Sequence, residues 1–257
     1  MSDDRELAGR VALVTGSARN IGRAIAVALA NGGASVMVSA RQSSGDAEKV
    51  AAEIREAGGQ SAVMLADVGE PSSAAGLVAA TVTRFGRLDI LVNNASVRRE
   101  VDFADLDYRE WREILATTLD GAYLCSHAAR PHLIASDLGT IINIGGLSAH
   151  AGAARRAHVI AAKAGLVGLT RALAYDFAPH NVVVNCVAPG VIDTVRPGPA
   201  ALDSALAREA GHYVRQLPPV GRKGSPEEIG ALVRFICGPG ARYITGQTIH
   251  INGGSYM

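Results

Sequence analysis

The sequence predicts an α/β protein whose doubly wound parallel β-sheet carries helices on both faces. Three observations indicate this class: short β-rich runs alternate with longer runs of helical period, the short runs are almost continuously apolar, and glycines mark the junctions. Strands that are covered on both faces are apolar throughout instead of alternating. Strands that alternate with helices are typical of right-handed βαβ crossovers and a parallel sheet.

Seven apolar runs are expected to be the strands of this sheet. They lie at residues 11–15, 35–40, 61–68, 88–95, 140–145, 182–189 and 247–252. The helix pattern is clearest between the second and third runs, where four residues fall at i, i+3, i+4 and i+7: Ala47, Val50, Ala51 and Ile54. That spacing predicts a helix with one buried face, and Gly58 and Gly59 predict where it ends.

Composition points to one globular domain over residues 1–257. The formal net charge is +1 and 48% of the residues are hydrophobic, which excludes a disordered chain and the basic balance of a nucleic-acid-binding protein. The three cysteines are far apart and form no CxxC pair, so we expect buried thiols and neither disulfides nor a metal site. No secretion signal is seen and no apolar run approaches membrane-spanning length, so we expect a cytoplasmic protein that binds no membrane.

One irregular segment interrupts the alternation of strands and helices. Residues 191–224 contain four prolines, and a fifth, Pro189, lies just before them. In a fold of this kind a long irregular segment is a candidate substrate lid.

The turn after the first strand carries the pattern of a phosphate-binding site. Glycines let the backbone turn tightly and approach a pyrophosphate, which rests on the amides of the following helix. The spacing is GxxxxxG and lacks the middle glycine of the full fingerprint, but the turn lies between a strand and an amphipathic helix, as the motif requires. The candidate cofactor-binding residues here are Gly16, Ser17, Arg19, Asn20, Ile21 and Gly22.

The end of the second strand indicates which dinucleotide is bound. NAD-binding proteins usually place an acid there for the ribose 2′-hydroxyl. Here the stretch is Ser39-Ala40-Arg41, without an acid, and Arg19 lies in the phosphate turn. Guanidinium groups suit a 2′-phosphate because their planar fork binds it in two places. We therefore expect NADP in preference to NAD.

Further motifs follow in order along the chain: DV at 67–68, NNAS at 93–96, AAKAG at 161–165, VAPG at 187–190 and GQTIHINGG at 246–254. With the phosphate turn, they make the chain resemble the short-chain dehydrogenase/reductase family over essentially its whole length. The resemblance implies a Rossmann-type seven-stranded sheet, an oxidoreductase acting on a small molecule, and a homotetramer or homodimer.

The resemblance also implies further cofactor contacts. Asp67 and Val68 would flank the adenine, and Asn94 and Ala95 would line the cofactor. The residues implied on the nicotinamide side are Pro189, Gly190, Ile192 and Thr194, and Lys163 would bind the nicotinamide ribose.

Catalysis in the family depends on a tetrad of Asn, Ser, Tyr and Lys, and only the lysine is matched here. Aligned on Lys163, the tyrosine position is Val159, the serine position is Gly146 and the asparagine position is Thr118. No tyrosine lies between Gly146 and Lys163, and the position seven before the lysine, used by an enoyl-reductase variant, is Arg156. The candidate catalytic residues are therefore Lys163, Thr118 and Ser148, whose hydroxyl lies close to the serine position.

Histidines offer other replacements. His158 lies five residues before Lys163, so on a helix it is turned roughly 140° away from it. His150, and His212 and Tyr213 in the irregular segment, remain candidates. Four arginines, Arg98, Arg99, Arg155 and Arg156, are either a clamp for an anionic substrate or solvated surface residues.

One branch of the family also lacks the tyrosine. Peroxisomal-type 2,4-dienoyl-CoA reductases resemble this chain in HVIAAK, with a histidine five before the lysine and a small residue at the serine position. In that branch an aspartate stands at the place of Thr118, whereas here the nearest acid is Asp120.

Three functions follow as hypotheses. The first is an NADP(H)-dependent oxidoreductase with a non-standard active site, acting on an activated carbonyl or a conjugated alkene. The second is a non-redox lyase or isomerase on the same fold, and the third is a catalytically silent NADP-binding scaffold.

Overall fold

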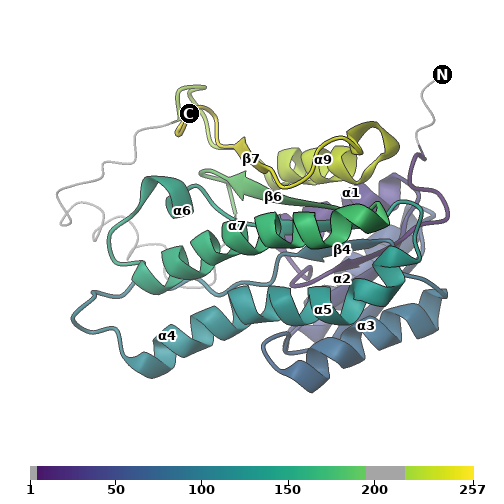
Figure 1. Cartoon of the computed structure of the whole chain (residues 1–257), viewed down its shortest axis with the longest axis horizontal. Helices are drawn as coiled ribbons and strands as arrows, with labels where there is room; N and C mark the ends of the chain where they lie inside the picture. Colours follow the sequence, from purple (N-terminus) through teal and green to yellow (C-terminus); the bar gives the residue numbers. More distant parts are fainter. Residues whose placement is uncertain (1–4, 195–217) are drawn as a thin grey trace.

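The sheet has seven parallel strands, as the sequence predicts (Figure 1). A computed structural model of the chain describes residues 5–194 and 218–257. The strand order is β3-β2-β1-β4-β5-β6-β7. Their bounds are β1 Val11–Val14, β2 Ser35–Ala40, β3 Ser61–Leu65, β4 Ile90–Asn93, β5 Thr140–Ile144, β6 Val183–Pro189 and β7 Thr248–Ile251. Each predicted strand is found, and the third and fourth are several residues shorter than expected.

Helices cover both faces of the sheet. The described helices are α1 Asn20–Asn31, α2 Ser44–Glu56, α3 Pro71–Phe85, α4 Tyr108–Leu115, α5 Gly121–Ile134, α6 Ser148–Ala151, α7 Ala157–Phe177 and α9 Pro226–Cys237. A π-helical turn, Ala116–Asp120, joins α4 to α5. Short 3-10 turns follow α7, at Ala178–His180, and α9, at Pro239–Ala241.

Alternate residues of each strand enter two separate cores. Ala12 and Val14 of β1 join the core under α1, α2 and α9, while Val11 and Leu13 join the core under α3, α5 and α7. Side chains of successive strand residues point to opposite faces, so a continuously apolar strand supplies both cores at once. The double core is the reason that the strands show no polar alternation.

The predicted helix between the second and third strands is confirmed as α2. Its buried residues are the four of the predicted face: Ala47, Val50, Ala51 and Ile54. Gly58 adopts φ of +83°, a conformation that favours glycine and ends the helical path. The candidate lid is described only in part, because residues 195–217, including His212 and Tyr213, lie outside the described residues.

Helix α7 is more apolar than the sequence analysis expected. With the 3-10 turn that follows, it forms 24 residues that contain an 18-residue window with a mean hydropathy of 1.2, so by length and composition it could cross a membrane. The same helix packs against β5 and β6 through Leu166, Thr170 and Phe177, and it carries the buried Lys163. A core helix of an α/β fold passes the length-and-composition test for this reason.

The strand order reverses beside β1. The chain leaves β1 to form β2 and β3 on one side, then returns to place β4 on the other side of β1. Crossovers that leave in opposite directions open a crevice at the carboxyl ends of the two strands, where ligands of such sheets bind. The residues that follow β1 and β4 therefore face one another across this crevice.

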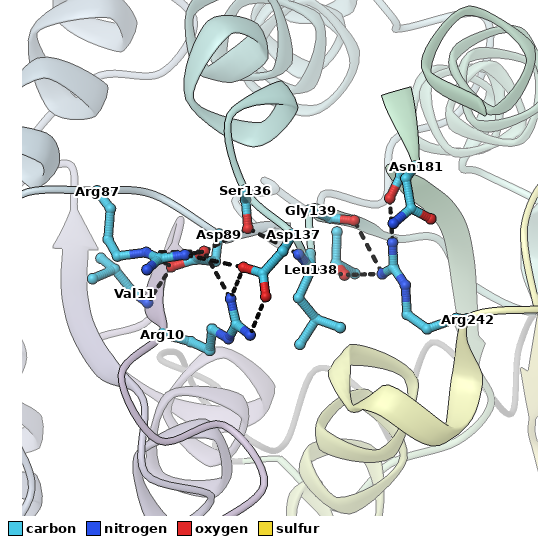
Figure 2. Close-up of polar contacts among 11 residues, drawn as sticks. Arg10, Val11, Arg87, Asp89, Ser136, Asp137, Leu138, Gly139, Asn181 and Arg242 are labelled. Carbon is cyan, nitrogen blue, oxygen red and sulfur yellow. Dashed lines mark hydrogen bonds and ion pairs between the residues drawn. The ribbon is translucent and has the colours of Figure 1, made fainter. Parts of the chain in front are cut away.

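The opposite end of the sheet is held by a buried carboxylate. Asp89 is fully buried just before β4, and its oxygens accept hydrogen bonds from the Val11 amide at 2.8 Å, the Arg87 guanidinium at 2.6 Å and the Ser136 hydroxyl at 2.5 Å (Figure 2). Arg10 lies 3.7 Å from the same carboxylate and also pairs with Asp137. One side chain thus ties the starts of β1, β4 and β5 together.

Replacing Asp89 with asparagine is expected to lower the free energy of unfolding by about 2–4 kcal/mol. The amide removes the charge that compensates Arg87, and its NH₂ group faces donors instead of accepting from them. Chemical denaturation measures the loss. The matched variant Asp137→Asn, at an exposed partner of Arg10, is expected to cost clearly less. Equal losses in the two variants would contradict the role given to Asp89.

Candidate functional site

The turn after β1 is shaped for close approach. Gly16 has φ of +64°, and a Cβ added to it would lie 2.9 Å from the Ala95 Cα atom. A Cβ on Gly22 would lie 2.8 Å from the Ser17 Cα atom. Both positions therefore require glycine. Helix α1 begins at Asn20, directly after this turn, and has no acidic residue in its first turn, which leaves its amides open to an anion.

Buried hydroxyl groups hold this turn in place. Ser17 is fully buried, donates to the Val14 carbonyl at 2.7 Å and accepts from the Ser39 amide at 2.9 Å. The structure thus gives Ser17 a role within the protein. Thr15 accepts from the backbone amides of both Asn94 and Ala95 at 3.0 Å, and so connects the turn to the end of β4.

Asn94 points at the turn from the other side of the crevice. Its side-chain amide donates to the Thr15 and Gly16 carbonyls, each at 2.9 Å. These bonds fix the distance between the ends of β1 and β4. Sequence reasoning named Asn94 as a cofactor contact, and in the structure it also positions the phosphate turn.

The candidate 2′-phosphate residues lie at the edge of the crevice. Arg19 is exposed at the start of α1, and the Arg41 guanidinium lies 3.8 Å from the Asp67 carboxylate, both partly exposed. Asp67 also accepts from the Gly69 amide at 3.0 Å, which fixes the loop after β3. Arg41 and Asp67 thus share one rim, and Val68 is buried beneath it.

Lys163 is a buried cation near the middle of this edge. It lies on α7 and is only 9% exposed, and its ammonium donates to the Ile144 carbonyl at the end of β5, at 2.5 Å. Burial lowers the pKa of Lys163 to about 8, and the neighbouring Cys186 thiol acts weakly in the opposite direction. Burial raises the pKa of Cys186.

Val159 lies one turn before Lys163 and is part of an apolar cluster. It is buried against Ile114 of α4 and Ala162, and Val97 and Leu115 pack around them. Gly146 follows β5, and a Cβ added to it would meet no atom within 4 Å. The positions matched to tyrosine and serine thus present an apolar wall and open space.

Thr118 lies on the π-helical turn and is 2% exposed. Its hydroxyl lies 3.1 Å from the hydroxyl of Ser96, the residue that replaces the last glycine of the usual NNAG. A π-turn inserts an extra residue into a helix and is frequent at functional sites. Two hydroxyl side chains 22 residues apart therefore meet as a hydrogen-bonded pair.

The residues after β6 lie beside the end of β7. Pro189 pairs with Ile251, the Gly190 amide donates to the Ile251 carbonyl at 3.0 Å, and Ile192 bridges to Gly224. Thr194 is the last described residue before the gap. Ser148 begins α6, close to the end of β5.

Three of the four arginines considered for an anionic clamp form ion pairs with acids. Arg99 holds Glu113 in two hydrogen bonds, of 2.7 and 3.1 Å. Arg98 and Arg156 both bind Glu100. The arginine charges hold the pKa of the Glu113 and Glu100 carboxyls below their usual range, in Glu100 against the larger opposing effect of burial. Each of these three arginines thus has an acid partner, with Glu100 shared between Arg98 and Arg156, which disfavours the anionic clamp.

His158 is fully buried on α7, and its Nε2 atom lies 3.7 Å from a Glu110 carboxylate oxygen on α4. Burial lowers the pKa of His158. The prediction that His158 turns away from the lysine face is consistent with this position against α4, and packing describes its role better than proton transfer. The described tyrosines are exposed, and none hydrogen-bonds to Lys163.

Comparisons with known proteins agree with this geometry. The model of the enoyl-(acyl carrier protein) reductase family matches residues 16–256. The 3-oxoacyl-(acyl-carrier-protein) reductase of Vibrio cholerae is 39% identical over 251 residues, 98% of this chain and 99% of the relative. The corresponding reductase of Synechocystis is 37% identical over 252 residues, 98% of each chain.

Solved structures give the same result. A short-chain dehydrogenase from Burkholderia cenocepacia in complex with NADP is 34% identical, with a TM-score of 0.87 over 97% of this chain and 98% of that one. A dehydrogenase/reductase from Sinorhizobium meliloti is 32% identical, with a TM-score of 0.90 over 99% and 98%. The chain belongs to the short-chain dehydrogenase/reductase family. It is an oxidoreductase of the short-chain dehydrogenase/reductase type. Within the family it is similar to 3-oxoacyl-(acyl-carrier-protein) reductases.

Sequence reasoning missed a buried polar chain that sets the site. The Asn93 side chain donates to Asn143 of β5 at 2.9 Å, and Asn143 donates to Thr170 of α7 at 2.9 Å. These two hydrogen bonds join β4 and β5 to α7, the helix that carries Lys163. Polar residues inside otherwise apolar strands, at Asn93 and Asn143, are the signal that would have found it.

Replacing Lys163 with methionine is expected to stabilise the cofactor-free protein at pH 7 by about 1–3 kcal/mol. The folded pKa of about 8 lies below the unfolded value of 10.5, so the ammonium opposes folding. Stability of the unmodified protein therefore rises as the pH increases from 8 to 10.5, and the difference between the two proteins shrinks. Thermal unfolding across this range measures it, with Lys49→Met at an exposed site as control. A destabilised methionine variant at pH 7 would refute the argument.

Proposed function

We propose that the chain is an NADP(H)-dependent oxidoreductase whose active site works without a tyrosine acid. The observation that carries the proposal is the pairing of a complete dinucleotide crevice and a buried Lys163 with the apolar Val159 one helical turn away. The cofactor apparatus is retained while the usual proton donor is missing. Thr118 and Gly146 stand for the other two lost groups.

The described residues fit a dinucleotide phosphate. The Gly16 and Gly22 positions let the turn pack tightly against Ser17 and Ala95, and α1 begins directly after it, so a pyrophosphate is proposed to lie on the backbone amides at the start of α1. Arg19 and Arg41 are the groups proposed to hold the 2′-phosphate of NADP, the cofactor present in the structure of the similar dehydrogenase from Burkholderia cenocepacia. Lys163 would hold the nicotinamide ribose. Bound NADPH supplies a hydride, and the protein supplies orientation and the exclusion of water.

The substrate class follows from the missing acid. A simple ketone needs a proton at oxygen as hydride arrives, and serine is a poor acid for that step. A conjugated carbonyl or enoyl thioester accepts hydride at the β-carbon, and the resulting enolate takes its proton at the α-carbon from water. The partly buried Val97, which packs against the buried Ile114 and Val159, offers an apolar contact for an acyl chain. Resemblance to 2,4-dienoyl-CoA reductases in HVIAAK supports the same class.

In this site Lys163 and Ser148 are proposed to act on different partners. Lys163 orients the ribose and adds positive charge near the developing enolate. Ser148, at the start of α6, orients the substrate or a water. Thr118, bonded to Ser96, is proposed to shape the pocket beside the π-turn instead of holding a relay water.

A second candidate function rests on the same departures. Since Lys163 serves the cofactor as well as the chemistry, loss of the other three tetrad members is also what a silent NADP-binding partner of an active reductase would show. The lyase or isomerase hypothesis has no further support in the described residues.

We also propose that the protein is a homotetramer or homodimer in the cytoplasm, as related enzymes are. Residues 191–224 are proposed to be the substrate lid of its single domain.

The proposal is tested by following oxidation of NADPH with a panel of acyclic ketones, enones and enoyl thioesters. Turnover is expected with the conjugated substrates and is expected to be absent or at least about a hundredfold slower with simple ketones, in line with the loss of general acid catalysis. Tight NADPH binding without turnover of any substrate would favour the silent partner instead.

Restoring the lost groups provides the matched variant. The open space around Gly146 admits a serine, so Val159→Tyr with Gly146→Ser is expected to gain carbonyl reduction by at least tenfold over the parent. Val159→Phe with Gly146→Ser controls for ring size without the hydroxyl. A gain that is the same in both variants would show that the phenol is not the missing acid.

Removing the proposed 2′-phosphate ligands is expected to weaken NADPH binding selectively. Arg41→Ala and Arg19→Ala should each raise the Kd for NADPH by about 10–100-fold, the effect of losing a charge-assisted hydrogen bond, and leave NADH nearly unchanged. Fluorescence titration measures both cofactors. Arg55→Ala, at an exposed arginine of α2, is the control. Parallel losses for NADPH and NADH would contradict the assignment.

A further inference from the structure

Three aromatic side chains from separate segments meet beside the site. His150 lies on α6, His250 on β7 and Tyr256 at the carboxyl end of the chain. The two imidazole centroids are 4.6 Å apart and nearly perpendicular, and the Tyr256 ring lies 5.0 Å from His250 and 5.6 Å from His150. Edge-to-face contacts at these distances favour neutral rings that pack together.

Each of the two imidazoles has a buried nitrogen that forms no hydrogen bond. The Nε2 atom of His150 and the Nδ1 atom of His250 are both buried and form no hydrogen bond. A neutral imidazole can leave one nitrogen unpaired at moderate cost, whereas an imidazolium needs partners for two N–H groups. Protonation therefore requires that one of the rings leave the cluster.

The surrounding charges act in the same direction. The titratable and charged groups that face His150 are His250 on β7, Tyr256 at the chain end and Arg171 on α7. Burial, followed by the His250 and Arg171 charges, lowers the pKa of His150 below its ordinary value of 6.5. Among the described residues, no acid contributes to holding a proton on His150.

This cluster anchors the segment that shapes the site. Helix α6 begins two residues after Gly146, carries Ser148, and consists of one turn with no residue in either hydrophobic core. Among the described residues, a backbone bond just before α6, from the Leu147 amide to the Pro189 carbonyl at 2.9 Å, ties its start to β6, and α6 also packs against α7. The His150 side chain adds the contact that joins α6 to β7 and to Tyr256. Tyr256 is itself fixed by its backbone carbonyl, which accepts from the Asn252 side chain at 3.0 Å.

We propose that His150 is a positioning residue whose neutral ring, clamped between His250 and Tyr256, holds α6 and its Ser148 in the active geometry. Acid protonates His150, the cluster opens, and α6 is released. The sign follows from the lowered pKa: the clamp is complete above pH 6.5 and is lost as the pH falls below it. The consequence for Ser148 rests on the proposed function, whereas the clamp itself does not.

Hydrogen exchange of the full chain tests the clamp without any activity. The α6 amides that form hydrogen bonds are those of Ala149, His150, Ala151 and Gly152. Their protection factors, corrected for intrinsic exchange, are expected to fall roughly tenfold between pH 7 and pH 5, because opening is coupled to one proton. The amides of β5 report global stability and are expected to change less. Protonation of His158 would change the protection of amides in α4 and α7, so its effect is distinguished from that of His150 by the helix in which it is seen.

Two variants decide the cause. His150→Phe keeps the ring and removes the titration, so its α6 protection is expected to be independent of pH. Tyr256→Leu removes a ring that the clamp needs and is expected to lower α6 protection already at pH 7. The control His127→Phe alters an exposed histidine that contacts Tyr123 on α5 and is expected to leave the pH response unchanged. An α6 pH response that persists in His150→Phe would overturn the proposal.

Turnover then reports the link to the site. If the chain reduces a conjugated substrate, kcat is expected to show an acid limb below pH 6.5 that disappears in His150→Phe, while the Kd for NADPH stays constant. A pH-dependent α6 without any turnover would leave the clamp standing and count against the proposed oxidoreductase. If the acid limb of kcat is unchanged in His150→Phe, the proposal that His150 positions Ser148 is wrong.

Discussion

The pairing of β4 with β1, on the side away from β2, is the constraint on which the site depends. It brings the turn after β1 and the residues after β4 to the same edge of the sheet, although they lie almost 80 residues apart. Asn94 then donates two hydrogen bonds to Thr15 across the crevice, from its backbone amide and its side chain, and these set the width of the crevice. The buried Asp89 secures the same strands at their other end, so their relative height is fixed at both edges.

Helix α7 combines a buried cation with an apolar packing residue one turn earlier. The helix is buried against β5 and β6 and presents Lys163 to the end of β5, and burial of that cation lowers its pKa at the expense of stability. Such perturbed groups cluster at functional sites. One turn earlier, Val159 completes an apolar cluster with α4. The packing of the helix at this position therefore needs no polar side chain.

Polar groups of the active-site region are arranged in compensated pairs. Ser96 and Thr118 meet each other, and the arginines at 98, 99 and 156 are paired with Glu100 and Glu113. A buried or half-buried polar group without a partner is costly, which favours such pairs. Buried imidazole nitrogens depart from this arrangement: those of His158, and one each of His150 and His250, lack partners.

The sequence by itself determined the α/β class, the seven strands, the buried face of α2 and the phosphate turn. These are local: apolar runs, helical spacing and glycines at junctions carry them, because period and backbone conformation are set by near neighbours. Only the tertiary structure decided that the Asn94 side chain bonds to the Gly16 turn. It also decided that the arginines at 98, 99 and 156 are paired with acids, and that His150 meets His250 and Tyr256. Those contacts join residues from distant parts of the chain. No local pattern specifies them, since they arise when the order of the strands places their ends side by side.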